Sequence, residues 1–76
     1  QIKRVPVSIE DQMEFIRNQL LLEKRVIFSR MVTGLKIKIQ IVYTFIALLE
    51  MVKMQLIGIK ESDNFNDFEI YELENG

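Results

Sequence analysis

The segment VYTFIALLEMVKMQLIG, residues 42–58, constrains the fold more than any other stretch of the chain. Its uninterrupted helix formers predict a helix from about Ile37 to Met54. When its residues are placed at about 100° each, apolar side chains gather on two opposite sides. A domain of 76 residues does not need a helix with two apolar sides, which raises the question of what covers the second side.

The first apolar side of this predicted helix carries its small residues. Thr44 and Ala47 allow neighbouring helices to approach closely, as a helix-turn-helix requires, so we expect this side to face the core. Its members are Ile41, Thr44, Ala47, Leu48 and Met51.

The opposite side is aliphatic and aromatic, whereas a DNA-reading helix would present Arg, Lys, Asn or Gln there. An exposed patch of this kind usually marks a protein interface. We therefore favour a partner surface over the alternative that the hairpin or the termini of the same domain cover it. The predicted partner-binding residues are Val42, Phe45, Ile46 and Leu49, with Lys38 and Lys53 as a charged rim.

Two further helices are predicted upstream. Ser8 is a good N-cap for an amphipathic helix from Ile9 to about Leu22. Ser29 can cap a short second helix. Gly34 is expected to end that helix in the left-handed conformation that glycine tolerates.

Three strands complete the pattern, at 26–28, 56–60 and 68–73. The order helix, strand, helix, helix, strand, strand predicts an α+β fold, a winged helix-turn-helix with three helices and a small antiparallel sheet. We expect residues 1–76 to form one domain, and the start at Gln1 indicates a fragment of a longer protein. The tip of the predicted hairpin, the wing, holds Asp63, Asn64 and Asn66.

Composition argues against several kinds of site. The chain has no Cys and no His, which removes thiolate chemistry, the usual general base and the commonest metal ligand. Asp63, Phe65 and Asp67 alternate like the start of a calcium loop, but Phe65 fails the third position. We expect no enzyme, no metal and no cofactor. The longest uncharged apolar run, 41–49, is too short for a membrane span of about 20 residues.

Charge is unevenly divided along the chain. Residues 1–38 hold eight basic and four acidic residues, a net charge of +4, whereas 39–76 hold two basic and seven acidic residues, −5. From Glu61 onward the chain holds six acidic residues and no basic one, and such a tail repels phosphate. No direct sequence-specific DNA binding is expected. One cluster of basic residues leaves weak contact with DNA open. The alternative is that its side chains are solvated at the helix edges or form ion pairs with Glu14 or Glu23. Its members are Arg17, Lys24, Arg25 and Arg30.

Three stretches carry a family resemblance. TFIALLEMVK, residues 44–53, resembles the TFLALLEL signature in the C-terminal domain of the bacterial segregation and condensation protein A family. The members of this family are kleisins. Ile27-Phe28-Ser29-Arg30-Met31 is similar to the family's Phe-Ser-x-Leu stretch, and residues 65–68 stand where its Phe-Gly-Asp-Ile stretch lies. The resemblance covers about Ser8 to Leu73. The departures are Glu61 for Gln, Asn66 for Gly, and Ile37-Lys38 for Ser-Arg.

The resemblance implies a winged helix that docks on the ATPase head of an SMC protein in the bacterial condensin. The family's SMC contacts match Phe45 and Leu49, which Val42 and Ile46 flank. It also implies a second condensin subunit bound by the rest of the kleisin, and a cytoplasmic, nucleoid-associated role in chromosome condensation, segregation and cell division. The alternatives are a winged-helix DNA-binding domain of a transcription regulator and a homodimerising adaptor that uses the same apolar side.

Overall fold

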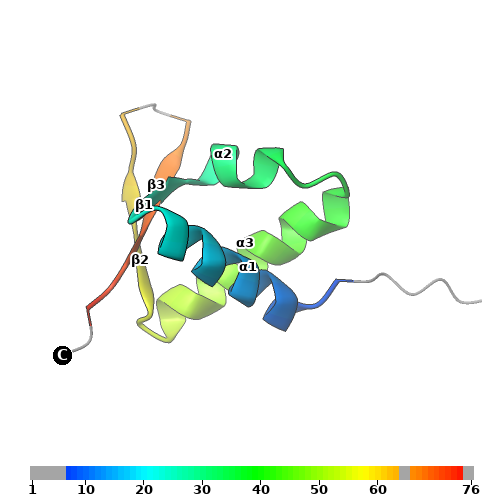
Figure 1. The fold of residues 1–76 in the computed structure, drawn as a ribbon, viewed down its shortest axis with the longest axis horizontal. Coiled ribbons are helices and arrows are strands. Elements are labelled where there is room, and N and C mark those ends of the chain that lie inside the picture. Colours follow the sequence, from blue (N-terminus) through cyan, green and yellow to red (C-terminus); the bar gives the residue numbers. More distant parts are fainter. Residues whose placement is uncertain (1–6, 64–65, 75–76) are drawn as a thin grey trace, which may run out of the picture.

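Three helices and three strands follow one another in the predicted order in the computed structural model, which describes residues 7–63 and 66–74 (Figure 1). The helices cross one another, and the sheet stands at one end of them. Two residues of the predicted wing, Asn64 and Phe65, lie outside the described residues. The elements are α1 Ile9–Leu22, β1 Arg25–Ile27, α2 Phe28–Thr33, α3 Lys38–Lys53, β2 Ile57–Glu61 and β3 Phe68–Glu72.

Helix α1 has the bounds that its sequence predicts. The hydroxyl of Ser8 accepts a 3.0 Å hydrogen bond from the backbone N–H of Asp11, which satisfies one free donor of the first turn. Glu10 and Asp11 also place negative charge at the positive end of the helix dipole. The helix buries Ile16 and Leu20 against α3 and the sheet.

Helix α2 differs from its prediction at both ends. Phe28 belongs to the helix rather than to the strand, and Ile27, not Ser29, is its N-cap residue. Gly34 is the C-cap, but its φ of −77° is right-handed, so the left-handed expectation was wrong. The physical reason is a tight final turn: the N–H of Leu35 bonds to the carbonyl of Val32 at 3.0 Å.

Helix α3 begins without a side-chain cap. It ends in a Schellman motif, in which the N–H groups of Leu56 and Gln55 bond to the carbonyls of Met51 and Val52, each at 2.9 Å. Gln55, with φ 62°, takes the left-handed position that glycine usually fills. This sharp exit directs the chain into β2.

The sheet is antiparallel in the order β1-β3-β2, with the wing strand β3 in the centre. Val26, Ile70 and Ile59 are paired across the three strands, and Val26 and Ile70 are buried in the core. The neighbouring row, which includes Gly58 and Tyr71, lies on the outer face of the sheet. A three-stranded sheet packed on three helices confirms the α+β class and is compatible with a winged helix.

The core joins α1, α3 and the sheet. Four of the five side chains that the sequence assigns to the core side of α3 are buried, and Ile41 is half-buried. Gln12 of α1 is also buried, although its side chain is polar. The buried apolar residues are Ile16, Leu20, Val26, Met31, Ala47, Leu48, Met51, Ile57 and Ile70.

Candidate partner interface

The outer face of α3, formed by Val42, Phe45, Ile46 and Leu49, is exposed. These side chains are 46%, 43%, 40% and 50% accessible, whereas Leu48 on the opposite side is fully buried. The described residues of the domain therefore leave this face exposed to solvent. The spacing i, i+3, i+4, i+7 places all four on one strip of the helix.

Phe45 is the anchored member of this face. Its ring meets the ring of Phe28 edge to face, with centroids 6.1 Å apart and planes at 79°. Phe28 in turn stacks on Phe68, at 4.7 Å and 19°. Phe28 and Phe68 are half-buried against the core. The three rings therefore form a column that runs from the base of the wing to the outer face.

The two rim lysines lie at opposite ends of α3. Lys38 is its first residue and Lys53 its last, and both are exposed. A helix of 16 residues is about 24 Å long, so the two charges flank the outer face rather than forming one patch. Lys53 also stabilises the negative end of the helix dipole, whereas Lys38 sits at the unfavourable end.

Asp67 fastens the wing to α2. Its carboxylate accepts hydrogen bonds from the backbone N–H of Ser29 at 3.2 Å, from the Ser29 hydroxyl, and from the N–H of Phe68 at 2.9 Å. The bond from the Ser29 hydroxyl is the main cause that lowers the pKa of Asp67, and the two backbone bonds add to it against desolvation. Asp67 thus supplies the cap that α2 lacks in its own sequence.

Sequence reasoning missed this role of Asp67, which it considered only as a calcium ligand. A signal was present: Phe28-Ser29 and Asp67-Phe68 fall within two of the stretches that carry the family resemblance. The structure brings these stretches together across 38 residues. No group of three His, Cys, Asp or Glu that could hold a metal ion occurs in residues 7–63 and 66–74.

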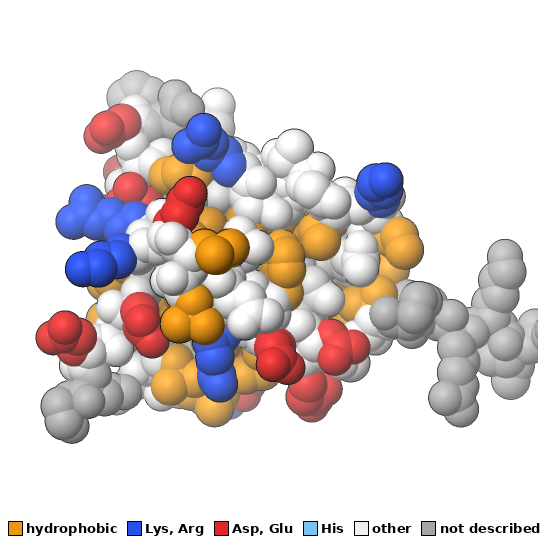
Figure 2. Space-filling model, viewed as in Figure 1, with side chains coloured by type: hydrophobic (Ala, Val, Ile, Leu, Met, Phe, Trp, Pro, Cys, Tyr) orange, Lys and Arg blue, Asp and Glu red, His pale blue; other side chains and the backbone are white. Residues whose placement is uncertain are grey.

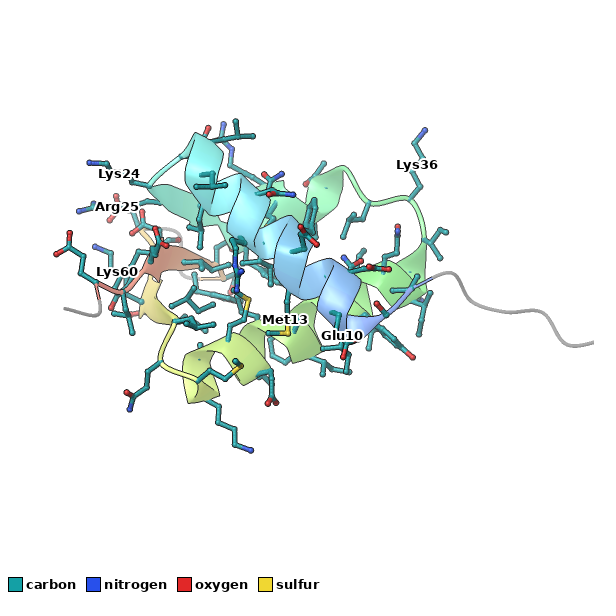
Figure 3. The ribbon with its side chains drawn as sticks, turned by 60° about the horizontal axis from the view of Figure 1, so that its bottom comes forward. Glu10, Met13, Lys24, Arg25, Lys36 and Lys60 are labelled. Carbon is teal, nitrogen blue, oxygen red and sulfur yellow. The ribbon has the colours of Figure 1, made fainter. Side chains whose placement is uncertain are left out.

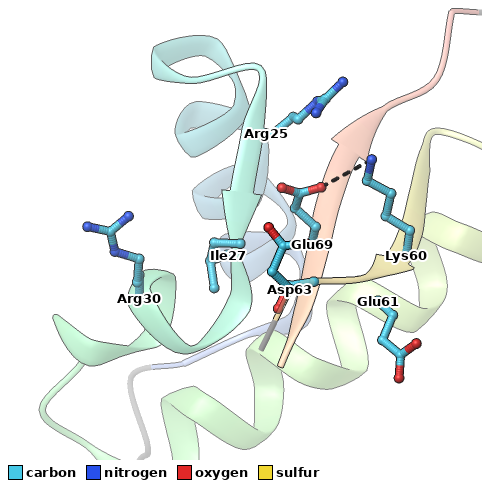
Figure 4. Close-up of a pocket in the computed structure, with 8 residues that line it drawn as sticks. Arg25, Ile27, Arg30, Lys60, Glu61, Asp63 and Glu69 are labelled. Atoms are coloured by element: carbon cyan, nitrogen blue, oxygen red, sulfur yellow. Dashed lines mark ion pairs between the residues drawn. The ribbon is translucent and has the colours of Figure 1, made fainter. Parts of the chain in front are cut away.

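An open hollow of about 460 Å³ lies on the outer face of the sheet (Figure 4). Arg25 and Arg30, from β1 and α2, stand on one side of it. Lys60 stands on the other side and pairs with Glu69 at 3.4 Å across the two strands. Three basic and three acidic side chains line it, so it offers no continuous positive surface to a phosphate backbone.

The four basic residues of the predicted group do not form one patch. Arg25 and Arg30 line the hollow, Lys24 lies with Glu72 and Glu74, and Arg17 lines a third depression with Glu72. Lys24, Arg25 and Lys60 gather at one end of the domain and Lys36 lies at the other (Figure 3). At the end of the domain that carries the sheet, acidic side chains lie among the basic ones (Figure 2).

A second exposed apolar site, which sequence reasoning also missed, lies at the end of α1. Leu21 and Leu22 are 76% and 79% accessible. They fall outside the buried stripe of α1. The signal in the sequence was their offset from Ile16 and Leu20, which follow each other at helical spacing. No helix in the described part of the chain is long and apolar enough to span a membrane.

Comparison with known proteins identifies the family of this domain. The model of the family "Segregation and condensation protein ScpA" matches residues 1–73. The chain belongs to this family. The resemblance seen in the helix signature is thus confirmed, and the family name refers to chromosome segregation and condensation.

Two curated relatives carry the name segregation and condensation protein A. The protein from Clostridium acetobutylicum is 39% identical over 63 residues, which are 83% of this chain and 25% of the relative. The protein from Clostridium tetani is 24% identical over 67 residues, 88% of this chain and 26% of the relative. The chain therefore spans about a quarter of the length of these relatives.

Proposed function

We propose that this chain is the C-terminal domain of a bacterial kleisin and that it docks on the ATPase head of an SMC protein through the outer face of α3. Its role is non-catalytic: it is a protein-interaction module of the condensin. The observation that carries the proposal is the exposure of four apolar side chains on one strip of α3, while the opposite side of the same helix is buried.

The outer face suits recognition by a hydrophobic groove. A helix that docks in a groove uses apolar anchors at i, i+3, i+4 and i+7, which is the spacing of Val42, Phe45, Ile46 and Leu49. An aromatic anchor such as Phe45 contributes about 2 kcal/mol or more when it is buried at an interface centre. Lys38 and Lys53 would act on the association rate more than on the affinity.

The larger role follows from the family. A kleisin bridges two SMC heads and closes a ring that acts on chromosomes in the cytoplasm, at the nucleoid. This chain spans about a quarter of its relatives. We propose that the rest of the kleisin contacts a second condensin subunit. The present domain supplies one attachment point and supports the ATPase cycle of its partner structurally.

The test is binding to the purified ATPase head of the SMC protein from the same organism, measured by titration calorimetry. Leu49→Arg and Val42→Arg put a charge on the outer face and keep the Phe45 ring that meets Phe28. Leu22→Arg makes the same change at a 79% exposed leucine on α1 and is the matched control. We expect the first two variants to weaken binding about 30-fold or more and the control to bind like wild type.

Circular dichroism must show that each variant is folded. Wild-type affinity in folded Leu49→Arg and Val42→Arg would place the docking surface elsewhere. Equal losses in Leu22→Arg would move the surface toward α1. Loss of fold in Leu49→Arg would mean that the outer face belongs to the core.

Two other functions compete with docking. A winged-helix DNA-binding domain would read bases with the outer face, which carries four apolar side chains instead of polar ones. Salt-sensitive binding to random duplex DNA would revive that function. A homodimerising adaptor would bury the same face against its own copy, and a dimer in sedimentation equilibrium that Leu49→Arg dissociates would favour it.

A further inference from the structure

The β1–β3 ladder continues beyond its last backbone pair through side chains. Its register pairs Arg25 with Tyr71, Val26 with Ile70 and Ile27 with Glu69. The next two positions in the same register are Phe28 with Phe68, whose rings stack, and Ser29 with Asp67, whose side chains are hydrogen-bonded. The wing is thus joined to α2 by side chains after the chain has left the sheet and begun a helix.

This extension ends at the outer face of α3. Phe28 contacts Phe68 on one side and Phe45 on the other. Among the three rings, only that of Phe45 is exposed, and the other two are half-buried. The ring of Phe28 is therefore the described aromatic neighbour of this exposed ring. The residue that follows Phe28, Ser29, is hydrogen-bonded to Asp67.

We propose that Asp67 and Ser29 are positioning residues of the outer face: they hold Phe28 against Phe68, so that Phe28 fixes the ring of Phe45 for its partner. This role rests on the proposed docking function. It adds the wing to the determinants of affinity without requiring that the wing touch the partner.

The short helix α2 has no N-terminal cap from its own residues. Its N-cap residue, Ile27, has no polar side chain, and no acidic residue lies in its first turn. The carboxylate of Asp67 supplies both the acceptor and the negative charge that the first turn lacks. When Asp67 is removed, the start of α2 loses its cap and the Phe28 ring loses one of the restraints on its position. A ring that is free to move in the unbound state must be ordered on binding, which costs affinity.

The first test is structural. Nuclear Overhauser contacts between the rings of Phe45 and Phe28 are compared in wild type, Asp67→Ala and Thr33→Ala. Thr33 donates a 2.5 Å hydrogen bond to the carbonyl of Ser29, so Thr33→Ala removes an α2 bond that does not involve Asp67. We expect the ring contacts to be lost in Asp67→Ala and kept in Thr33→Ala. Unchanged ring contacts in Asp67→Ala would overturn the positioning role, whatever the binding result.

The second test is a double-mutant cycle of binding to the SMC head. Asp67→Ala should weaken binding about threefold to tenfold in the wild-type background, because an ordered side chain becomes mobile. In the Phe45→Ala background the further loss should be less than about twofold, because the ring on which Asp67 acts is gone. A merely structural role would weaken both backgrounds equally, and this result would also overturn the proposal.

Two more variants keep the test decisive. Ser29→Thr retains the hydroxyl and should bind like wild type, whereas Ser29→Ala should lose part of the affinity. If Asp67→Ala fails to fold, Ser29→Ala replaces it in both tests. The docking function can fail separately. If Leu49→Arg binds like wild type while Asp67→Ala still loses its ring contacts, the SMC head does not use the outer face, but Asp67 still positions Phe45.

Discussion

The side-chain amide of Gln12 donates a 2.8 Å hydrogen bond to the hydroxyl of Thr44 and so joins α1 to α3 inside the core. The same hydroxyl donates to the carbonyl of Gln40 at 2.6 Å. Both side chains are buried, and no buried side-chain polar atom of the described residues lacks a partner. This bond lies on the side of α3 that faces the core, opposite the outer face.

Breaking this bond from one end should be costly. Thr44→Val keeps the volume but leaves the Gln12 amide buried without its acceptor, and we expect the free energy of unfolding to fall by about 1–3 kcal/mol. Replacing both partners, Gln12→Leu with Thr44→Val, should recover part of this loss, because no polar group is then stranded. Urea denaturation followed by circular dichroism measures both. An unchanged midpoint for Thr44→Val would show that the bond contributes nothing.

Two adjacent leucines test the two sides of α3. Leu48 is fully buried and Leu49 is 50% exposed. Leu48→Ala should lower the free energy of unfolding by about 3–5 kcal/mol, because it removes buried atoms and leaves a cavity. Leu49→Ala should lower it by about 1 kcal/mol or less, because only part of that side chain leaves water on folding. Equal costs in thermal or urea unfolding would mean that the outer face is core.

Two glycines should respond in opposite directions to alanine. Gly34 is right-handed, and a Cβ there would meet no atom within 4 Å. Gly34→Ala should raise the free energy of unfolding by about 0.5–1 kcal/mol through a less flexible unfolded chain. Gly58 pairs with Tyr71, whose ring atoms would lie 2.5–2.7 Å from a new Cβ. Gly58→Ala should therefore lower the stability by about 1 kcal/mol or more.

The Gly58 effect has its own control. Tyr71→Ala removes the ring that the new Cβ would meet, so Gly58→Ala should cost less in that background. Denaturant midpoints of the four proteins give this coupling. A cost that is the same in both backgrounds would mean that the ring is not the cause.

The parts of the fold that depend on local sequence were predictable. Helix α1 has an N-cap serine and a regular apolar stripe, and its bounds agree at both ends. The core side of α3 follows from periodicity alone, and so does the existence of a second apolar side. The prediction that a partner covers that side remains a prediction, because coverage depends on a molecule outside this chain.

The parts that failed depend on distant residues. Phe28 has the β-propensity of a strand residue, but α2 begins there, and its cap comes from Asp67, 38 positions away from Ser29. Gln12 was missed because an apolar stripe counts only apolar residues, and its burial is stabilised by Thr44, 32 positions away. Hydrogen bonds between separate helices and strands produce no periodic pattern in the sequence, so periodicity in one sequence does not predict them.

Acid should release the bond between the wing and α2. The hydrogen bond from the Ser29 hydroxyl lowers the pKa of Asp67 below its ordinary value of 3.8. A carboxylate whose pKa is lower in the folded state stabilises the fold above the unfolded-state pKa and loses this contribution as the pH falls through the folded-state pKa. The stability difference between wild type and Asp67→Asn should therefore be constant above pH about 5 and shrink below pH 3.8.

Denaturation at a series of pH values measures this difference. Ser29→Ala provides the control background, because it removes the main cause of the lowered pKa while keeping the Asp67 carboxylate. The control comparison is between Ser29→Ala and the double variant that carries Ser29→Ala together with Asp67→Asn. The stability difference between these two proteins should depend less on pH, because the pKa of Asp67 then lies closer to its unfolded-state value. Equal pH dependence with and without the hydroxyl would show that the Ser29 side chain does not hold the Asp67 charge.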